Sequence, residues 1–306
     1  MSTPEPSAAP GPVLEISGVS RNFRRRGGET VAAVRGVSLT VNRGETVALV
    51  GESGSGKSTL ARIALGLLPP DTGQVKLLGE PLYGIAAARL RRIRTAMQPV
   101  FQDSGAAFNP RRTVQQLLAQ AVADRSLQGT RLQSHIVSLL ERVRLRPGSE
   151  FLMRFPHELS GGQRQRLAIA RAIAMNPILI VADEPLSGAD VSTRGQILNL
   201  LLDLRDSSGV AYLFITHDIA IAQAFAHRVA VMYRGEIVEH GDATTVIDSP
   251  ADPYTRRLVA AIRTLDGPAT AAFPPRLRGN GASPSPSRDG TTGPGAESRL
   301  RQVAGL

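Results

Sequence analysis

The 306-residue chain contains no cysteine. This absence excludes disulfides, thiolate metal sites, iron–sulfur clusters and cysteine nucleophiles, and it fits a reducing compartment. Hydrophobic residues nevertheless make up 42% of the chain. The length and this apolar content suit one large α/β domain or two smaller ones with an ample core.

Long apolar runs are missing as well. No run reaches the roughly 20 residues that a membrane-spanning helix needs. The first residues, MSTPEPSAAPGP, have neither the basic segment nor the apolar stretch of a secretory signal. We therefore expect a chain that is soluble by itself, with any membrane attachment provided by partner proteins.

Lysine is scarce, because Lys57 and Lys76 are the only two in a chain with a formal net charge of +10. Arginine supplies nearly all of the positive charge. Such a charge could attract nucleic acid or anionic lipid, or it could reflect a general preference for arginine codons. We favour the second interpretation and expect no nucleic-acid partner, since the arginines are scattered and their short runs, RNFRRRG and RLRRIR, are not interleaved with aromatic residues.

The two ends of the chain are rich in small and turn-forming residues. Residues 1–12 are rich in Pro, Ala and Ser, and residues 267–306 repeat this composition with more Gly and Arg. Segments of this kind bury too little apolar surface to offset the entropy of ordering. We predict disorder at both ends and a folded region of about 13–266.

Short apolar runs alternate with helical patterns through most of the folded region. Several runs are nearly continuous, which is typical of strands buried on both faces of a sheet. Alternating strands and helices predict a mostly parallel sheet covered on both sides. The expected strands are 13–19, 37–41, 46–51, 74–79, 96–101, 178–183, 210–216, 228–233 and 236–241, and the expected helices are 57–67, 113–124, 192–206 and 217–227.

Residues 104–175 differ from the rest, because they contain no convincing strand and several segments with helical spacing of apolar residues. We predict a helical subdomain inserted into the α/β core. The chain shows no internal repeat.

The segment GESGSGKS at 51–58 matches the phosphate-binding pattern GxxxxGK[ST] and lies between an apolar strand and a helical pattern. Its glycines allow backbone N–H groups to turn inward, and the following helix N-terminus attracts anions. The alternative is a chance glycine-rich turn, which this flanking context disfavours. The predicted nucleotide-binding residues are Gly51, Glu52, Ser53, Gly54, Ser55, Gly56, Lys57 (for the β and γ phosphates), Ser58 (also a Mg²⁺ ligand) and Thr59 (for the α phosphate).

An acidic pair ends the apolar run ILIVADE, at Asp183 and Glu184. Neighbouring side chains on a strand point in opposite directions, so the two carboxylates can do different work. Asp183 is expected to hold Mg²⁺, and Glu184 to act on the attacking water. Taken alone, the pair could equally be a solvated helix start, where acidic residues are common.

The sequence LSGGQRQRLAIARA at 159–172 resembles the signature motif of ABC ATPases. Its first residues would open a helix with free N–H groups, which is a second phosphate site. The resemblance implies a head-to-tail dimer in which each ATP lies between one chain's phosphate loop and the signature residues of the other. The signature residues assigned to ATP are Ser160, Gly161, Gly162 and Gln163.

Four more positions match the family's motifs in the right order. Gln102 in PVFQD resembles the glutamine that contacts Mg²⁺ and water, and His217 in LFITHD resembles the histidine that contacts the γ phosphate. Asp190 in SGAD corresponds to the acidic residue at the dimer seam, and Phe23 to the aromatic residue that stacks on adenine. A lone histidine or phenylalanine is more often a surface or core residue. One departure is SGAD, where the family usually has SALD.

The resemblance covers about residues 13–266 and implies the fold of a P-loop NTPase of the ABC type. This fold has a RecA-like, mostly parallel core, an N-terminal antiparallel β-subdomain and the inserted helical subdomain at about 104–175. It also implies an ATPase that uses ATP and Mg²⁺ and lies on the cytoplasmic face of the membrane. The implied partners are integral membrane permease subunits, a second ATPase subunit (identical or paralogous) and, indirectly, an extracytoplasmic solute-binding protein.

Two segments point to the importers of peptides and nickel within this family. FNPRRTV at 108–114 and SPADPYTRRLVAAI at 249–262 resemble motifs of that subfamily, with Asp252 where the family usually has His. Peptides are the expected solute, with nickel, glutathione or another small solute as alternatives. A soluble ABC ATPase acting on ribosomes or DNA, and a non-catalytic regulatory subunit, are the competing functions.

The segment FNPRRTV allows two interpretations of its first residue, Phe108. It could anchor a helix of a membrane subunit, with Arg111 or Arg112 at the rim of the contact, because transient interfaces combine apolar anchors with a charged rim. It could also belong to the core of the helical subdomain.

Overall fold

The computed structural model describes residues 11–24, 28–102 and 108–265. The predicted disordered ends lie outside these residues, apart from residues 11 and 12, so their disorder stays a prediction.

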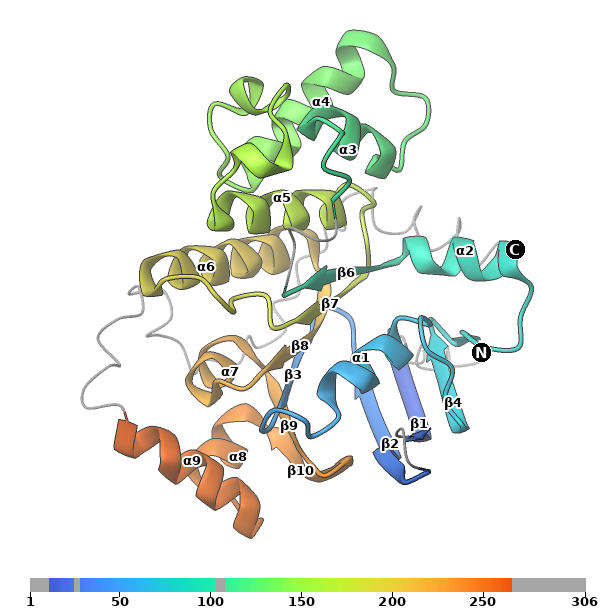
Figure 1. Ribbon diagram of the computed structural model, residues 1–306, viewed down its shortest axis with the longest axis vertical. Helices are drawn as coiled ribbons and strands as arrows, with labels where there is room; N and C mark the ends of the chain where they lie inside the picture. Colours follow the sequence, from blue (N-terminus) through green and yellow to red (C-terminus); the bar gives the residue numbers. More distant parts are fainter. Residues whose placement is uncertain (1–10, 25–27, 103–107, 266–306) are drawn as a thin grey trace, which may run out of the picture.

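A six-stranded sheet forms the centre of the molecule (Figure 1). Five of its strands are parallel, and β10 pairs antiparallel with β9 at one edge. All residues of β8 and all but the last of β7 are buried, as the continuous apolar runs predict. The strand order is β10 (Glu236–Asp242), β9 (Arg228–Tyr233), β3 (Thr46–Val50), β8 (Ala211–Thr216), β7 (Leu179–Asp183) and β6 (Met97–Phe101).

A second, antiparallel sheet lies beside the first. Its strand β1 pairs antiparallel with the edge strand β2, with several irregularities in register, and with β4 on its other side. An apolar core that includes Val47 and Leu49 of β3 joins the two sheets. The strand order is β2 (Thr30–Val41), β1 (Leu14–Arg24), β4 (Thr72–Leu77) and β5 (Glu80–Pro81).

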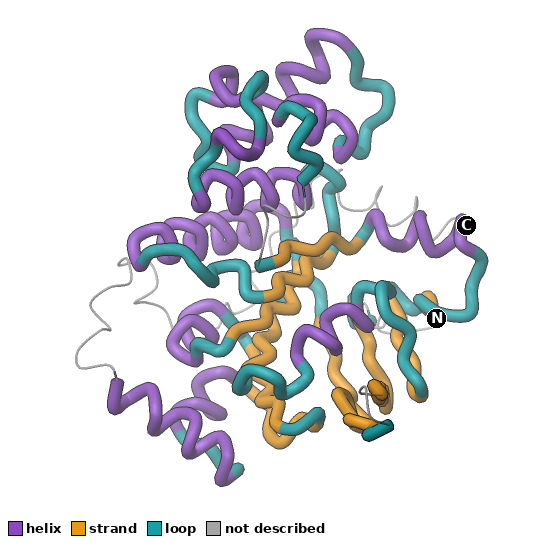
Figure 2. Tube along the Cα trace, in the orientation of Figure 1, coloured by secondary structure: helices purple, strands orange, loops and turns teal. Residues whose placement is uncertain are grey.

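Helices cover both faces of the central sheet (Figures 1 and 2). On one face, α1 packs in the core shared with the antiparallel sheet. On the other face, α6 and α7 pack against the sheet, and α8 and α9 complete a smaller core with β3 and β9. These helices are α1 (Lys57–Ala64), α2 (Ala87–Thr95), α6 (Val191–Ser208), α7 (Ile219–Phe225), α8 (Ala243–Asp248) and α9 (Pro253–Leu265).

Residues 108–178, before β7, are largely helical and rise above the sheet (Figure 1). Thr113 caps the first of these helices in a reciprocal capping box with Gln116. Phe108 is 5% exposed in the core of this layer, and the Arg171 guanidinium lies 5.0 Å from its ring centroid. The core interpretation of Phe108 therefore holds, and the residue is not a free docking anchor. The elements are α3 (Val114–Ala121), α4 (Gly129–Arg142), the 3₁₀ turns η1 (Gly148–Phe151) and η2 (Pro156–Glu158), and α5 (Gly161–Ile173).

The predicted fold class is confirmed: a mostly parallel core, an antiparallel N-terminal sheet and a helical segment within the core sequence. The exact domain boundaries remain predictions. The sequence interpretation missed α2, whose RLRRIR segment we took only as a short basic run. Leu90 and Ile93 are the residues of α2 that pack into the core, and its arginines face solvent or bind neighbours.

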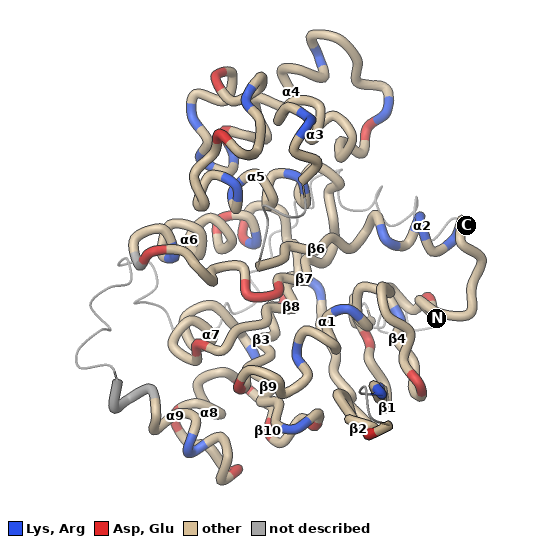
Figure 3. Tube along the Cα trace, in the orientation of Figure 1, with Lys and Arg blue, Asp and Glu red and all other residues tan. Residues whose placement is uncertain are grey.

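Basic residues are spread along all the described parts of the chain (Figure 3). This distribution agrees with the scattered arginines of the sequence. Within the described ranges, no helix is both long enough and apolar enough to cross a membrane.

Candidate nucleotide-binding site

The phosphate loop connects β3 to α1 and is shaped by glycines whose neighbours leave no room for a side chain. Gly51 has φ +152°, and a Cβ there would lie 2.2 Å from the Met232 carbonyl oxygen. Gly56 has φ +109°, and its Cβ would lie 2.1 Å from the Ala33 carbonyl oxygen. Gly56 also stands at the N-cap of α1 without a side-chain cap. The first N–H groups of α1 are therefore not capped by its N-cap side chain, as an anion site requires.

Lys57 lies in the centre of this loop and is 5% exposed. Its Nζ donates to the carbonyl oxygens of Gly51 at 2.8 Å and Glu52 at 2.7 Å, and to Ser55 Oγ at 3.4 Å. Burial lowers the pKa of Lys57, while the charges of Glu184 and Asp183 act in the opposite direction. The loop thus holds its own ammonium group where an incoming phosphate would compete for it.

Ser58 and Asp183 meet although 125 residues separate them. Ser58 Oγ, in the first turn of α1, donates to Asp183 Oδ1 at 3.2 Å, at the end of β7. Burial raises the pKa of Asp183, and the hydrogen bond from Ser58 opposes this effect. A bound cation would favour the ionised carboxylate.

Glu184 directly follows Asp183 but points to a different partner. Its Oε1 lies 3.3 Å from His217 Nδ1, and its N–H donates to the Ile215 carbonyl oxygen. Glu184 has φ +47°, a left-handed conformation that is unfavourable for a residue with a Cβ. Strained backbone of this kind concentrates at functional sites. The two predicted residues for water and γ phosphate are therefore adjacent.

The protein does not supply a complete set of metal ligands by itself in its described residues. In the described part of the chain, no group of three or more His, Asp or Glu side chains could hold a metal ion. Magnesium usually binds through one or two carboxylates together with substrate phosphates and water. The contact between Ser58 and Asp183 fits an ion that arrives with a nucleotide, and these two residues would hold it.

Three of the four assigned signature residues, Ser160, Gly161 and Gly162, line a separate cavity of about 360 Å³. Ser160 caps α5, and its side chain and that of Gln163 form a reciprocal capping box. A Cβ on Gly162 would lie 2.9 Å from Thr193 Cγ2, so α5 and α6 meet closely at their N-termini. The cavity lining also includes Gln102.

Asp190 caps α6 at the rim of the same cavity. Its carboxylate accepts hydrogen bonds from the Thr193 N–H at 2.8 Å and from the hydroxyls of Ser192 and Thr193. These bonds, that from Ser192 first, lower the pKa of Asp190 to about 2. The carboxylate is therefore fixed and charged at the surface where we expect a second subunit.

Gln102 contacts a residue that the sequence interpretation did not single out. Its Nε2 donates to Ser187 Oγ at 2.9 Å, which links the end of β6 to the segment after Glu184. Ser187 is the first residue of SGAD, a motif that we used only to assign Asp190, and Thr193 belongs to none of the motifs considered. Gln102 is thus near the signature cavity and one short segment away from the Glu184–His217 pair.

The remaining predicted residues lie at the surface of the phosphate loop or apart from it. Glu52, Ser53 and Gly54 are exposed, while Ser55 is buried and Thr59 half-buried. Phe23, near the end of β1, is 40% exposed, and the Arg21 guanidinium lies 5.4 Å from its ring centroid. An exposed aromatic face is what adenine stacking requires.

Comparison with known proteins agrees with this geometry. The profile of the family described as ABC transporter matches residues 34–187. The glutathione import ATP-binding protein GsiA of Salmonella paratyphi A is 46% identical over 262 residues, which cover 83% of this chain and 42% of that protein. GsiA of Escherichia coli O6:H1 is 45% identical over 258 residues, covering 82% and 41%. The chain therefore spans less than half the length of these relatives.

Solved structures show the same architecture. The dimeric structure of MJ0796, a bacterial ABC transporter cassette, has a TM-score of 0.68 at 30% identity and covers 75% of this chain and 98% of its own. A post-hydrolysis state of the same cassette with ADP and Pi matches equally well. The structure of cbiO1 from Clostridium perfringens has a TM-score of 0.68 at 25% identity, covering 85% and 97%.

Proposed function

Because the chain belongs to the ABC transporter family, we propose that it binds and hydrolyses ATP to power the import of a small peptide-like solute through separate membrane proteins. The relatives named for glutathione import support both the direction of transport and the class of solute. Di- and oligopeptides are the broader class, and glutathione, itself a tripeptide, is the specific candidate within it.

The observation that carries the proposal is the meeting of Ser58 with Asp183, with Glu184 next to it and facing His217. Three segments that are far apart in sequence supply these groups at the carboxyl ends of the parallel strands β3, β7 and β8. Together they offer a cradle for phosphates, ligands for the accompanying Mg²⁺ and a carboxylate for the attacking water.

The roles follow from the chemistry of each group. Lys57 would leave its loop carbonyls and place its charge on the β and γ phosphates. Glu184 would accept a proton from the attacking water or orient it, and His217 would hold both that carboxylate and the γ phosphate. Mg²⁺, when bound, neutralises charge on the phosphate oxygens.

The signature cavity supports a dimer. It is lined by the α5 N-terminus and Asp190, and its lining contains no residue of the phosphate loop. We propose that the signature residues serve an ATP held by the phosphate loop of a second subunit. The similar cassette MJ0796 is itself dimeric. Permease subunits and an extracytoplasmic binding protein complete the proposed assembly.

The experiment is transport by a reconstituted assembly. The chain is purified together with the membrane subunits that accompany it and placed in proteoliposomes with MgATP. We expect ATP-dependent uptake of glutathione or a dipeptide, which the Lys57→Ala chain should not support. ATP hydrolysis without any membrane partner, stimulated by ribosomes or DNA, would favour a soluble ABC ATPase instead. Uptake of nickel but not of peptides would contradict only the proposed solute and would leave the proposed ATPase function intact.

A further inference from the structure

The C-terminal helix α9 begins beside the phosphate loop. Tyr254, its second residue, is 5% exposed, and its Oη accepts a hydrogen bond from the Glu52 N–H at 3.1 Å. This bond joins residues 202 positions apart in the sequence. The phosphate loop is therefore held from outside by an element that belongs to no nucleotide-binding motif.

The tyrosine ring is itself fixed by stacking. The rings of Tyr254 and Tyr233 lie with centroids 4.2 Å apart and planes at 29°. Tyr233 ends β9, and the turn that follows it contacts the same loop, because the Gly235 N–H donates to the Ser55 carbonyl oxygen at 2.9 Å. The β9–β10 turn and α9 thus support the phosphate loop at two points, Ser55 and Glu52.

The start of α9 is anchored by hydrogen bonds of its own. Asp252 caps the helix, with Oδ1 accepting from the Tyr254 N–H at 2.7 Å and the Thr255 N–H at 3.4 Å. Glu239 on β10 accepts from the N–H groups of Ala251 at 2.8 Å and Asp252 at 3.0 Å. The aspartate in place of the family's histidine therefore has a clear structural role: it fixes the residue that reaches the loop.

Glu52 shows why this contact matters for nucleotide binding. Its N–H is held by Tyr254, and its carbonyl oxygen is held by Lys57 Nζ at 2.7 Å. When Lys57 turns toward the phosphates, the carbonyl loses its partner and the hydrogen bond to Tyr254 remains. We propose that Tyr254 is a positioning residue that preserves the shape of the phosphate loop while Lys57 changes partners.

This inference rests on the proposed ATP binding, and it predicts a particular kinetic signature. Without the Tyr254 hydroxyl, the start of the loop samples other conformations, so a smaller fraction of the protein is ready to bind. Losing one hydrogen bond corresponds to roughly a 2- to 10-fold change in that equilibrium. The KM for ATP should rise by that factor, while kcat stays within about twofold because the Glu184–His217 pair is untouched.

Tyr254→Phe is the decisive variant, because it removes the hydroxyl and keeps the ring stack. Tyr233→Phe is the matched control, since it removes a hydroxyl from the other ring and leaves the Tyr254–Glu52 bond in place. Hydrogen exchange of residues 51–58 is measured on the full chain without nucleotide, followed by KM and kcat for MgATP and by melting temperature.

We expect faster exchange and a raised KM in Tyr254→Phe alone, with a melting temperature close to that of the parent. Unchanged exchange of residues 51–58 would overturn the inference, whatever the ATPase activity shows. A lower melting temperature with parental KM and exchange would also overturn it, by reducing Tyr254 to a packing residue. Failure of the parent to bind MgATP would instead contradict the proposed function, because the exchange measurement needs no nucleotide.

Discussion

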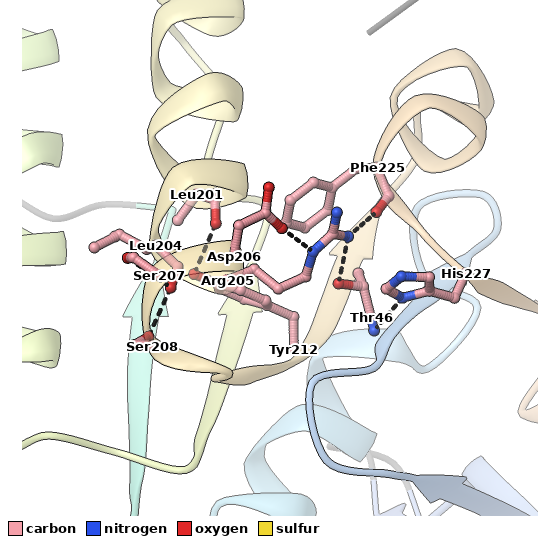
Figure 4. Close-up of polar contacts among 10 residues, drawn as sticks. All are labelled: Thr46, Leu201, Leu204, Arg205, Asp206, Ser207, Ser208, Tyr212, Phe225 and His227. Carbon is pink, nitrogen blue, oxygen red and sulfur yellow. Dashed lines mark hydrogen bonds and ion pairs between the residues drawn. The ribbon is translucent and has the colours of Figure 1, made fainter. Parts of the chain in front are cut away.

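The two ends of the central sheet use polar groups in opposite ways. Lys57, Asp183 and Glu184, which we propose for nucleotide binding, lie at or just beyond the carboxyl ends of β3 and β7. At the opposite end, polar groups from α6, β3 and the start of β9 bind one another (Figure 4). The same sheet therefore presents one end for a ligand and closes the other.

The closed end is organised around Arg205, near the end of α6. Its Nη1 donates to the Phe225 carbonyl oxygen at 3.2 Å and lies 3.5 Å from Thr46 Oγ1, and its Nε lies 3.3 Å from Asp206 Oδ1 (Figure 4). The guanidinium also lies 5.8 Å from the centroid of the Phe225 ring. Each of these partners belongs to the protein itself.

The open end carries the unfavourable features. Glu184 has a left-handed backbone, and the buried ammonium of Lys57 has loop carbonyls as its partners. Such costs persist where a structure is prepared for a ligand. Substitutions at the open end should therefore change function more than stability, and those at the closed end should do the reverse.

Glu184→Gln tests the open end with the largest expected effect. The amide has the same size but is a far poorer base, so turnover should fall by about 10²-fold or more. Nucleotide affinity should be retained. The melting temperature should stay nearly unchanged, because glutamine fills the same space as Glu184 beside His217. Single-turnover hydrolysis is the measurement, with Glu236→Gln on β10 as a control. Turnover within a few fold of the parent would contradict the assignment.

Lys57→Ala should weaken nucleotide binding itself. Charge-assisted hydrogen bonds to phosphate contribute about 1.5 to 3 kcal/mol, so affinity should fall by roughly 10- to 100-fold. Titration calorimetry with a non-hydrolysable ATP analogue measures this change. Lys76→Ala on β4, which removes the chain's only other lysine, is the matched control. Equal affinities for both variants would show that the phosphate loop is misassigned.

The fold could be predicted where hydrophobic pattern and burial coincide. The runs at β3, β7 and β8 are apolar because both faces of these strands are buried, and that pattern is visible in the sequence. Helix α2 was missed because it contains many arginines and only two residues, Leu90 and Ile93, that pack into the core. A helix held by so few apolar positions gives a weak periodic signal.

The site could be predicted where backbone geometry restricts residue type. Glycines at 51 and 56 are required by the nearby carbonyls of Met232 and Ala33, so the loop leaves a pattern in the sequence. Tyr254 and Ser187 lie within SPADPYTRRLVAAI and SGAD, but neither segment indicates the hydrogen bond that its residue makes to a distant part of the chain. Contacts of that kind depend on tertiary packing, which the local sequence does not specify.

Arg205→Met tests the closed end. Methionine keeps the apolar stem but leaves the Phe225 carbonyl without its charged donor, which should cost about 1 to 3 kcal/mol in the free energy of unfolding. Affinity for ATP should not change, because Arg205 lies at the other end of the sheet. Urea unfolding and nucleotide titration are measured together, with Arg91→Met on the exposed face of α2 as the control. Parental stability combined with weaker ATP binding would show that this end of the sheet serves function and not stability, which contradicts the comparison.

The smallest effect concerns the pH dependence of the closed end. His227 Nδ1 accepts a hydrogen bond from the Thr46 N–H at 2.9 Å, so the folded state favours the neutral ring (Figure 4). Burial, and then the charge of Arg205, lowers the pKa of His227 below its ordinary value of 6.5, against the opposing charges of Glu45, Asp206 and Asp242.

A lowered pKa means that the unfolded chain binds more protons than the folded one just below pH 6.5. The stabilisation from His227 should therefore be complete above pH 6.5 and lost as the pH falls toward the folded-state pKa. Since the ring is still partly exposed, solvent screening keeps the effect small. Unfolding free energies of the parent and His227→Gln at pH 7.5 and 5.5 measure it, with His240→Gln on β10 as a control for losing a histidine. We expect a shallower decline in His227→Gln, since glutamine can accept the same hydrogen bond without titrating. An equal decline in both proteins would show that the closed end is not sensitive to the protonation of this ring.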